Sequence, residues 1–274
     1  TESMIKEIED KSTTLAKALG VKGLLNIQFA IKDDTLFILE ANPRASRTMP
    51  FVSKVTGNQI IKAGTLLMLG HSLDSIKKTT NYLNSSTNKV AIKKAIFPWS
   101  RFPAEDTMLG PEMKATGEVL GIGRSFGVAL NKAYAAAGVE INENEKGIFV
   151  SLSDQEKPNF IKIVKTYSDL GFKIYSTYGT GEYLKNSEIN STIVGRADET
   201  FPTSLTILQD KLISLVINTP TFANEYTDGW KIRRLSHETG VAVVSSVREA
   251  EAFLKAFLET TKSFEDMEAI QNVS

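Results

Sequence analysis

The chain has 274 residues, with 32 basic and 32 acidic side chains and no cysteine. This balance leaves no global field for nucleic acid or an acidic membrane, so neither is expected as a partner. The absence of cysteine excludes disulfides, thiolate metal sites and cysteine nucleophiles. No apolar run is long enough to cross a bilayer and no signal-peptide pattern is present, so we expect a cytoplasmic protein with two domains.

The first half of the chain predicts a mixture of helices and strands. Hydrophobic residues recur at helical spacing over 4–19, and Gly20 follows as a stop. Alternating segments at 23–31 and 35–41 flank the polar turn Asp33-Asp34 and predict an antiparallel hairpin. Further predicted elements are helices at 49–55 and 57–69, a polar loop at 79–88, a strand at 89–97, a turn-rich segment, and a helix at 125–137.

The pattern changes after the charged run 142–146, which we interpret as a domain boundary. Strands and helices then alternate with short loops, which predicts a doubly wound α/β domain with a parallel sheet. The predicted strands are 147–152, 172–176, 191–195, 212–217 and 241–244, and the predicted helices are 158–170, 180–186, 226–238 and 247–259. We therefore expect three parts: 1–70, a connecting segment 71–143, and 144–274.

Polar side chains gather at the end of the predicted hairpin. Gln28 and Glu40 can face each other across the two strands, and Asn42 shares a face with Glu40. Three such oxygen donors suit Mg²⁺ or Mn²⁺, and Arg44 and Arg47 just beyond could contact phosphate or carboxylate oxygens. The more ordinary interpretation of this spacing is a polar hairpin face with surface arginines in ion pairs.

A second candidate site follows the predicted strand 172–176, in the segment 176–181, STYGTG. Backbone amides at such a turn, with a helix dipole behind them, can bind an anion. Arg196, Asn218 and Thr219 follow other predicted strands, at the edge where doubly wound sheets bind ligands. The alternative is a plain turn in which Thr180 only caps the helix.

Two segments carry a family resemblance that covers essentially the whole chain. Residues 29–31, FAI, and 39–54, LEANPRASRTMPFVSK, are similar to the end of an ATP-grasp domain of carbamoyl phosphate synthetase large chains. Residues 109–121, LGPEMKATGEVLG, resemble the segment just before the regulatory domain of the same family. The last part resembles the methylglyoxal-synthase-like domain that ends these chains.

The resemblance implies that Gln28, Glu40 and Asn42 bind the Mg²⁺ or Mn²⁺ ions of ATP, with Gln28 and Glu40 also in the nucleotide site. Arg44 and Arg47 would steady the anionic acceptor or product of carbamate phosphorylation. The full enzyme would make carbamoyl phosphate from ATP, bicarbonate and ammonia supplied by a glutaminase small subunit. The rest of the ATP site is missing from this chain, so we expect the fragment alone to be inactive.

The resemblance also implies a small phosphorylated effector, such as UMP or IMP, in the last domain. Thr177, Gly179 and Thr180 match the phosphate-binding pattern, and Asn218 is kept, with Thr219 beside it. Arg196 stands where a lysine is usual, Pro220 replaces a threonine, and Lys146 follows Glu145 where a lysine is expected. Lys94 replaces the glutamate of ornithine-activated enzymes, which disfavours ornithine.

Two other interpretations of the chain are a purely ligand-binding regulatory fragment and a methylglyoxal-synthase-type lyase. The lyase needs an acidic general base, and the segment 217–221 contains none, so we expect binding without catalysis. His71 and His237 are assigned to surface positions at helix ends, and Trp99 to packing. Arginine and pyrimidine synthesis both remain open as the pathway, as does the sign of the effector's action.

Overall fold

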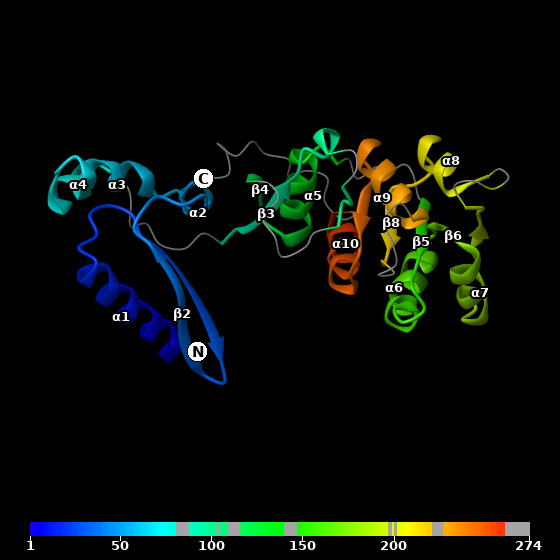
Figure 1. Ribbon diagram of the computed structural model, residues 1–274, viewed down its shortest axis with the longest axis horizontal. Helices are drawn as coiled ribbons and strands as arrows, with labels where there is room; N and C mark the ends of the chain where they lie inside the picture. Colours follow the sequence, from blue (N-terminus) through cyan, green and yellow to red (C-terminus); the bar gives the residue numbers. More distant parts are fainter. Residues whose placement is uncertain are drawn as a thin grey trace. The chain divides into compact units, whose positions relative to one another are not determined.

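The computed structural model describes residues 1–80, 88–102, 105–108, 116–139, 147–196, 199, 202–220 and 227–260. The chain divides into two compact units, the first running from Thr1 to Asn88 and the second beginning at Lys89 (Figure 1). The three-part division at 70/71 and 143/144 stays a prediction, because the charged run 142–146 and most of the segment 109–121 lie outside the described residues.

The first unit is built on a two-stranded antiparallel hairpin, as predicted. Asp33 and Asp34 form its turn with positive φ angles of 49° and 56°, a conformation that Asp tolerates better than most residues. The elements of this unit are α1 (Glu2–Ala18), β1 (Asn26–Lys32), β2 (Thr35–Asn42), α2 (Thr48–Thr56), α3 (Ile60–Met68) and α4 (Leu73–Thr79).

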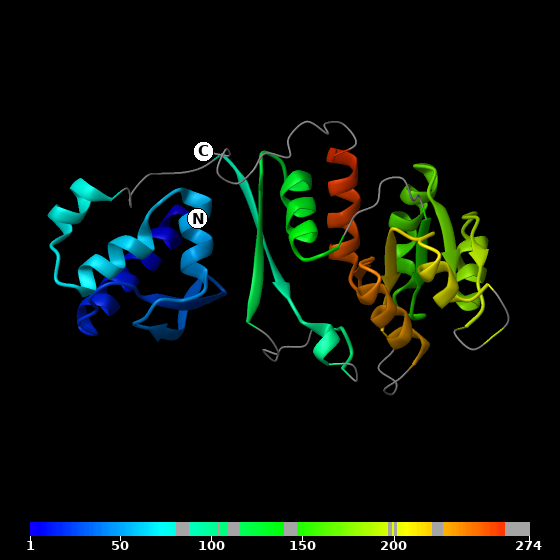
Figure 2. The same ribbon diagram turned by 90° about the horizontal axis from the view of Figure 1, so that it is seen from above.

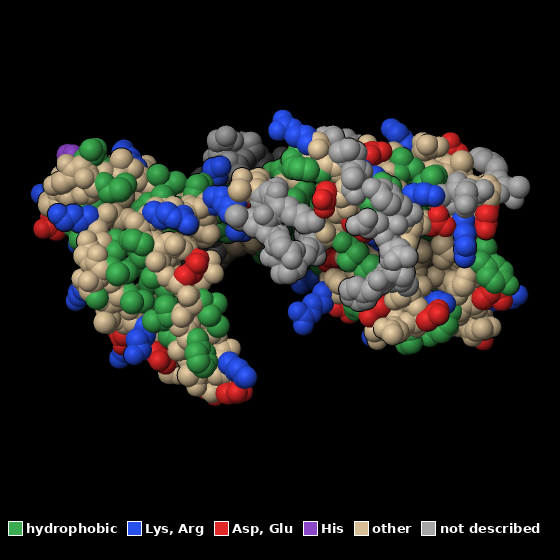
Figure 3. Space-filling model, in the orientation of Figure 1, with side chains coloured by type: hydrophobic (Ala, Val, Ile, Leu, Met, Phe, Trp, Pro, Cys, Tyr) green, Lys and Arg blue, Asp and Glu red, His purple; other side chains and the backbone are tan. Residues whose placement is uncertain are grey.

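Much apolar surface of the first unit is exposed. Helix α1 buries none of its residues, and Phe37, Ile38 and Leu39 of β2 are all exposed. Figure 3 shows hydrophobic side chains on the surface over the hairpin and α1. A face with this much apolar surface is typical of one that packs against further protein.

The second unit opens with a hairpin and a helix. Strands β3 (Val90–Ile96) and β4 (Gly117–Gly123) pair antiparallel, with the short 3-10 helix η1 (Trp99–Arg101) after β3, and α5 (Phe126–Ala136) covers them. The sequence did not predict β4, because glycines at 117, 121 and 123 are poor strand formers. Packing explains Gly121, since a Cβ there would lie 2.0 Å from the Ala129 carbonyl oxygen of α5.

The rest of the second unit is a five-stranded parallel sheet in the order β7-β6-β5-β8-β9. The predicted doubly wound fold is therefore confirmed. The chain runs outward from β5 to one edge and then returns to start again at β8, which places the topological switch point between β5 and β8. The strands are β5 (Gly147–Ser151), β6 (Lys173–Ser176), β7 (Thr192–Ile193), β8 (Leu215–Asn218) and β9 (Ala242–Val244).

Helices cover both faces of this sheet (Figure 2). Side chains alternate along β5, so that Ile148 and Val150 pack with α6 (Lys157–Asp169), α7 (Tyr178–Asn186) and α10 (Val247–Thr260). Phe149, fully buried, faces the other way toward α8 (Ser204–Gln209) and α9 (Asp228–Glu238). Helix α10 also packs on α5, which joins the hairpin layer to the sheet.

Helices α4 and α8 were not predicted. Both are short, and α8 depends on a capping box in which Thr203 and Thr206 satisfy each other's backbone amides. Such local polar contacts can stabilise a single turn without a long hydrophobic period. None of the described helices has the length and apolar character that a membrane span requires.

We predict that Gly121→Ala destabilises the second unit by more than about 2 kcal/mol, because the added methyl meets the backbone of α5. Gly179→Ala is the matched control, since only the Lys157 Nζ lies near its Cβ, at 3.7 Å. Urea unfolding followed by tryptophan fluorescence measures both. Equal stability of the two variants would contradict the proposed close packing of β4 on α5.

Candidate functional site: an anion pocket at the switch point

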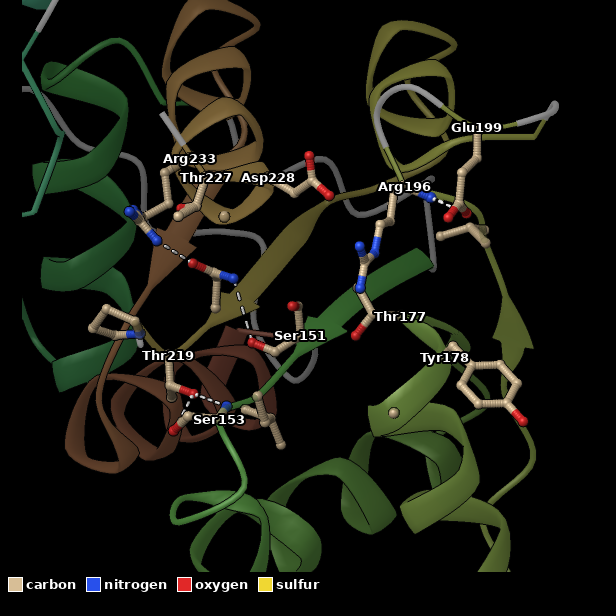
Figure 4. Close-up of a pocket in the computed structure, with 16 residues that line it drawn as sticks. Ser151, Ser153, Thr177, Tyr178, Arg196, Glu199, Thr219, Thr227, Asp228 and Arg233 are labelled. Atoms are coloured by element: carbon tan, nitrogen blue, oxygen red, sulfur yellow. Dashed lines mark hydrogen bonds between the residues drawn. The ribbon is translucent and has the colours of Figure 1, made fainter. Parts of the chain in front are cut away.

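A pocket of about 650 Å³ opens at the carboxyl ends of β5, β6 and β8 (Figure 4). This is the edge where doubly wound sheets bind ligands, because the connections on either side of the switch point run in opposite directions and leave a crevice. The described lining residues are Ser151, Leu152, Ser153, Thr177, Tyr178, Gly179, Val194, Arg196, Glu199, Asn218, Thr219, Pro220, Thr227, Asp228, Gly229 and Arg233.

The start of α7 supplies hydrogen-bond donors to this pocket. Thr177 is the N-cap residue, but its side chain makes no capping hydrogen bond to the helix backbone. Its hydroxyl lies 3.2 Å from the Thr180 hydroxyl instead. The first-turn amides therefore have no side-chain cap, and they stand at the positive end of the helix dipole. An anion in the pocket can accept from them.

Two buried threonines fix the backbone behind the pocket. The Thr180 hydroxyl accepts from the Leu152 amide at 3.0 Å, and the Thr219 hydroxyl accepts from the Ser153 amide at 2.8 Å. Thr180 is only 1% exposed and lies behind the lining, whereas Thr219 lines the pocket. Thr180 thus positions the loop after β5, and Thr219 both holds that loop and faces the pocket.

A buried polar network closes one side of the pocket. Asn218, at the end of β8 and 2% exposed, accepts at 2.5 Å from the Nη1 of Arg233, and its amide donates to the Ser151 carbonyl at 3.4 Å. Arg233 also pairs through two nitrogens with the Asp106 carboxylate, one of them at 2.9 Å. Arg233 and the Ser151 carbonyl thus fix the orientation of the Asn218 side-chain amide.

Arg196 places a guanidinium group on the opposite side of the pocket. In Figure 4 its side chain extends across the pocket toward Thr177. Within the described part of the chain its guanidinium has no ion-pair partner, while its backbone amide donates to Glu199 at 2.9 Å. A free guanidinium beside uncapped amides favours a phosphate or carboxylate ligand.

The structure brings most of the predicted effector residues together. Thr177, Gly179, Arg196, Asn218 and Thr219 line one pocket, and Thr180 supports it from behind. Lys146 lies outside the described residues. These positions remain proposals for a binding site, because their contacts with a ligand are inferred from the protein alone.

Three charged pocket residues were missed by the sequence analysis. Glu199 and Asp228 place carboxylates in the lining, although the segment 217–221 contains none, and Arg233 provides a second guanidinium. Glu199 comes from the loop after β7, while Asp228 and Arg233 come from α9. No local motif marks them, because their position depends on where α9 docks on the sheet.

The hairpin site of the first unit has the predicted register. Gln28 pairs directly with Glu40, and a bulge follows Gln28. Asn42 donates to the Glu40 carboxylate at 2.9 Å, so the two side chains meet on one face. One carboxylate and two amide oxygens fit part of the coordination of a hard divalent cation, which takes its other ligands from water and phosphate. The residues present therefore fit Mg²⁺ or Mn²⁺.

Two exposed arginines follow β2. The Arg44 guanidinium donates to the Ala45 carbonyl at 3.1 Å, and Arg47 immediately precedes α2. Both lie within the short connection between β2 and α2, next to Asn42. Their contact with a ligand of the hairpin site stays a prediction.

A second pocket, of about 340 Å³, lies between the β3–β4 layer and the sheet domain of the second unit. Lys94 stands in it with its Nζ 4.1 Å from the centre of the Tyr134 ring. His237 lies in the last turn of α9, as expected, but it is only partly exposed, because α9 packs it against Trp99 with ring centroids 5.7 Å apart. Burial lowers the pKa of Lys94, and the Glu249 carboxylate opposes this.

Burial also lowers the pKa of His237 to about 4, with a further lowering from the charges of Lys94 and Arg234 and an opposing effect of Asp106. An unfolded histidine titrates near 6.5, so between these two pH values only the unfolded chain takes up the proton. The contribution to stability is complete above about pH 6.5 and is lost as the pH falls toward 4.

We predict that the free energy of unfolding falls more in the wild type than in the His237→Phe variant when the pH is lowered from 7.5 to 5.0. The expected difference is about 1–2 kcal/mol. Phenylalanine keeps the stacking on Trp99 and cannot titrate. Urea unfolding at both pH values measures the difference, and His71→Phe, at an exposed position, is the control. Equal pH dependence of wild type and His237→Phe would contradict the lowered pKa.

Two families match the chain. Residues 1–76 match the carbamoyl-phosphate synthase L chain, ATP binding domain, and residues 159–245 match the MGS-like domain. The chain is 36% identical to a carbamoyl phosphate synthase large chain, C-terminal section, of Aquifex aeolicus, over 97% of this chain and 52% of the relative. The corresponding section of Methanocaldococcus jannaschii is also 36% identical, over 96% and 43%.

A full-length carbamoyl phosphate synthase large chain of Brucella suis is 40% identical over 92% of this chain and 22% of its own length. The chain thus spans about half, or less, of the relatives it matches. Both matched families occur in one order along the chain, and each falls on the part of the structure that has the expected fold: the hairpin unit and the doubly wound sheet. The chain belongs to the carbamoyl phosphate synthase large-chain family and corresponds to the C-terminal part of such a chain.

Proposed function

We propose that this chain is the part of a carbamoyl phosphate synthase that completes its carbamate-phosphorylating site and carries its effector domain. The full enzyme would make carbamoyl phosphate from ATP, bicarbonate and ammonia, with a glutaminase small subunit as its partner. This proposal is supported by the similarity to large chains of the family, in which an ATP-binding match precedes an MGS-like match.

The hairpin would form the metal side of the phosphorylation site. Gln28, Glu40 and Asn42 would hold Mg²⁺ or Mn²⁺ against the phosphates of ATP, with Gln28 and Glu40 also reaching the nucleotide. Such a cation offsets charge on the phosphoryl group during transfer. Arg44 and Arg47 would orient the anionic acceptor. The exposure of Glu40 supports this role, since a strand-end carboxylate that faces outward is available to a ligand.

The sheet domain would bind a small phosphorylated effector. This proposal is supported above all by the pocket itself, which brings together the uncapped start of α7 and the guanidinium of Arg196, for which the described residues provide no ion-pair partner. The Asn218 amide and the Thr219 hydroxyl also lie in the lining, and the Thr219 hydroxyl oxygen already accepts from the Ser153 amide. A pocket that offers donors and a cation selects an acceptor-rich anion such as phosphate.

The size of the pocket indicates a ligand larger than a bare phosphate. A volume of about 650 Å³ is within the range for small-molecule sites and accommodates a nucleoside monophosphate such as UMP or IMP. The Glu199 carboxylate also lies in the lining and would repel a second phosphate placed near it. The charge of Asp228 is partly offset by Lys231, whose Nζ lies 3.7 Å from the Asp228 carboxylate. We therefore expect monophosphates to bind better than triphosphates.

We predict that Glu40→Gln, in the full-length large chain, lowers carbamate phosphorylation by at least about 100-fold, because the metal loses its carboxylate ligand. The partial reaction that forms ATP from ADP and carbamoyl phosphate measures this step. Glu9→Gln, at an exposed position of α1, is the control and should leave the rate unchanged. A normal rate for Glu40→Gln would exclude the metal role.

We predict that UMP or IMP raises the melting temperature of this chain more than UTP, ornithine or N-acetylglutamate does. A ligand bound only by the native state at 100 times its Kd adds about 2.7 kcal/mol. Thr177→Val and Gly179→Ala should lose most of this shift, the first by removing a donor and the second by placing a methyl at the phosphate cradle. Thr166→Val, on α6 and outside the lining, is the control.

Two results would contradict the assignment. A shift that survives both pocket variants would place the effector elsewhere. If the chain converts dihydroxyacetone phosphate to methylglyoxal, the expectation that the domain binds a ligand without catalysis is wrong. The variants Asp228→Asn and Glu199→Gln would then show which of the two pocket carboxylates is the general base.

A further inference from the structure

Arg233 occupies an unusual place in the second unit. It lines the anion pocket and also the second pocket, and no other described residue lines both. Its side chain is only 6% exposed, so its charge must be balanced by groups in direct contact. The guanidinium stands in the wall between the two cavities, at the edge of the anion pocket (Figure 4), and donates there to the Asn218 side-chain oxygen.

The charge of Arg233 has one carboxylate partner among the described residues. Asp106 binds two of its nitrogens, and Asn218, a neutral amide, binds the third. Gly229 leaves room for this arrangement, since a Cβ there would lie 3.1 Å from the Nη1 of Arg233. An anion bound in the pocket would therefore meet a guanidinium that Asp106 already neutralises.

Asp106 belongs to a segment that α9 holds at two points. Its carboxylate accepts from the Met108 amide at 3.2 Å. The neighbouring arginine, Arg234, donates to the carbonyls of Trp99 and Phe102, each at 2.7 Å. Arg233 and Arg234 thus fasten the two ends of the segment 99–108, but only Arg233 also faces the anion pocket.

We propose that Arg233 couples occupancy of the anion pocket to residues 105–108, because a bound anion and the Asp106 carboxylate compete for its guanidinium. This inference rests on the proposed effector site. Binding of an anion weakens the pair between Arg233 and Asp106 and loosens residues 105–108, while Arg234 keeps residues 99–102 in place. By thermodynamic reciprocity, a weaker pair strengthens anion binding by the same factor.

The test is Asp106→Asn, at a residue outside the pocket lining. With inorganic phosphate as the probe, titrated against melting temperature at constant ionic strength, we expect the apparent Kd to fall by at least about fivefold. Glu238→Gln is the matched control. It removes the carboxylate 3.0 Å from Arg234 on the same helix and should change the Kd by less than about twofold.

The outcomes separate this inference from the effector site itself. If the wild type binds phosphate and Asp106→Asn binds it equally or more weakly, the coupling is wrong and the site stands. If the wild type does not bind phosphate, both are wrong. If Glu238→Gln lowers the Kd for phosphate as much as Asp106→Asn does, the change in net charge explains the effect and the coupling is wrong.

A second measurement needs no variant that could fail to fold. Hydrogen exchange of the wild-type chain, with and without saturating phosphate, reports the amides of Met108 and Phe102 separately. We expect exchange at Met108 to accelerate by at least about fivefold when phosphate binds, and exchange at Phe102 to stay unchanged. Unchanged or slower exchange at Met108 would contradict the competition for Arg233.

Discussion

The anion pocket depends on how the central strand β5 ends. Parallel pairing with β6 and β8 fixes β5 on both sides up to Ser151, and the chain must then leave the sheet between two diverging connections. Its next two amides, Leu152 and Ser153, would be unsatisfied without the hydroxyls of Thr180 and Thr219. The two threonines thus satisfy the backbone amides at the end of β5, and this fixes the loop that forms one wall of the pocket.

Helix α9 gives the pocket its connection to the rest of the second unit. Its first residues line the anion pocket, and its two adjacent arginines reach the segment between β3 and β4. Buried guanidinium groups require partners at defined positions, because an unpaired buried charge costs several kcal/mol. A helix that is held in this way cannot shift at one end without a change of partners at the other, which is the physical basis for the coupling proposed for Arg233.

The candidate metal site of the first unit depends only on local structure. Its hairpin register sets Gln28 opposite Glu40, and the pleat sets Asn42 on the same side, so the donor set needs only two strands. The exposed apolar side chains of the hairpin and α1 show that these described elements do not complete a core among themselves. A site that is local in sequence can thus be present in a unit whose packing surfaces remain open.

The sequence alone determined the hairpin register, the alternation of strands and helices in the last part of the chain, and the turn at Thr177 to Thr180. Each of these depends on periodicity or on residues within a few positions of one another. It did not show β4, where Gly121 and Gly123 closely approach the backbone of α5, nor the contact of His237 with Trp99. The tertiary structure alone placed Arg233, Glu199 and Asp228 around one pocket, with Asp106 bound to Arg233 outside the lining. These residues lie far apart in the chain, and they meet because α9 docks across the end of a parallel sheet, a long-range packing that local sequence patterns do not encode.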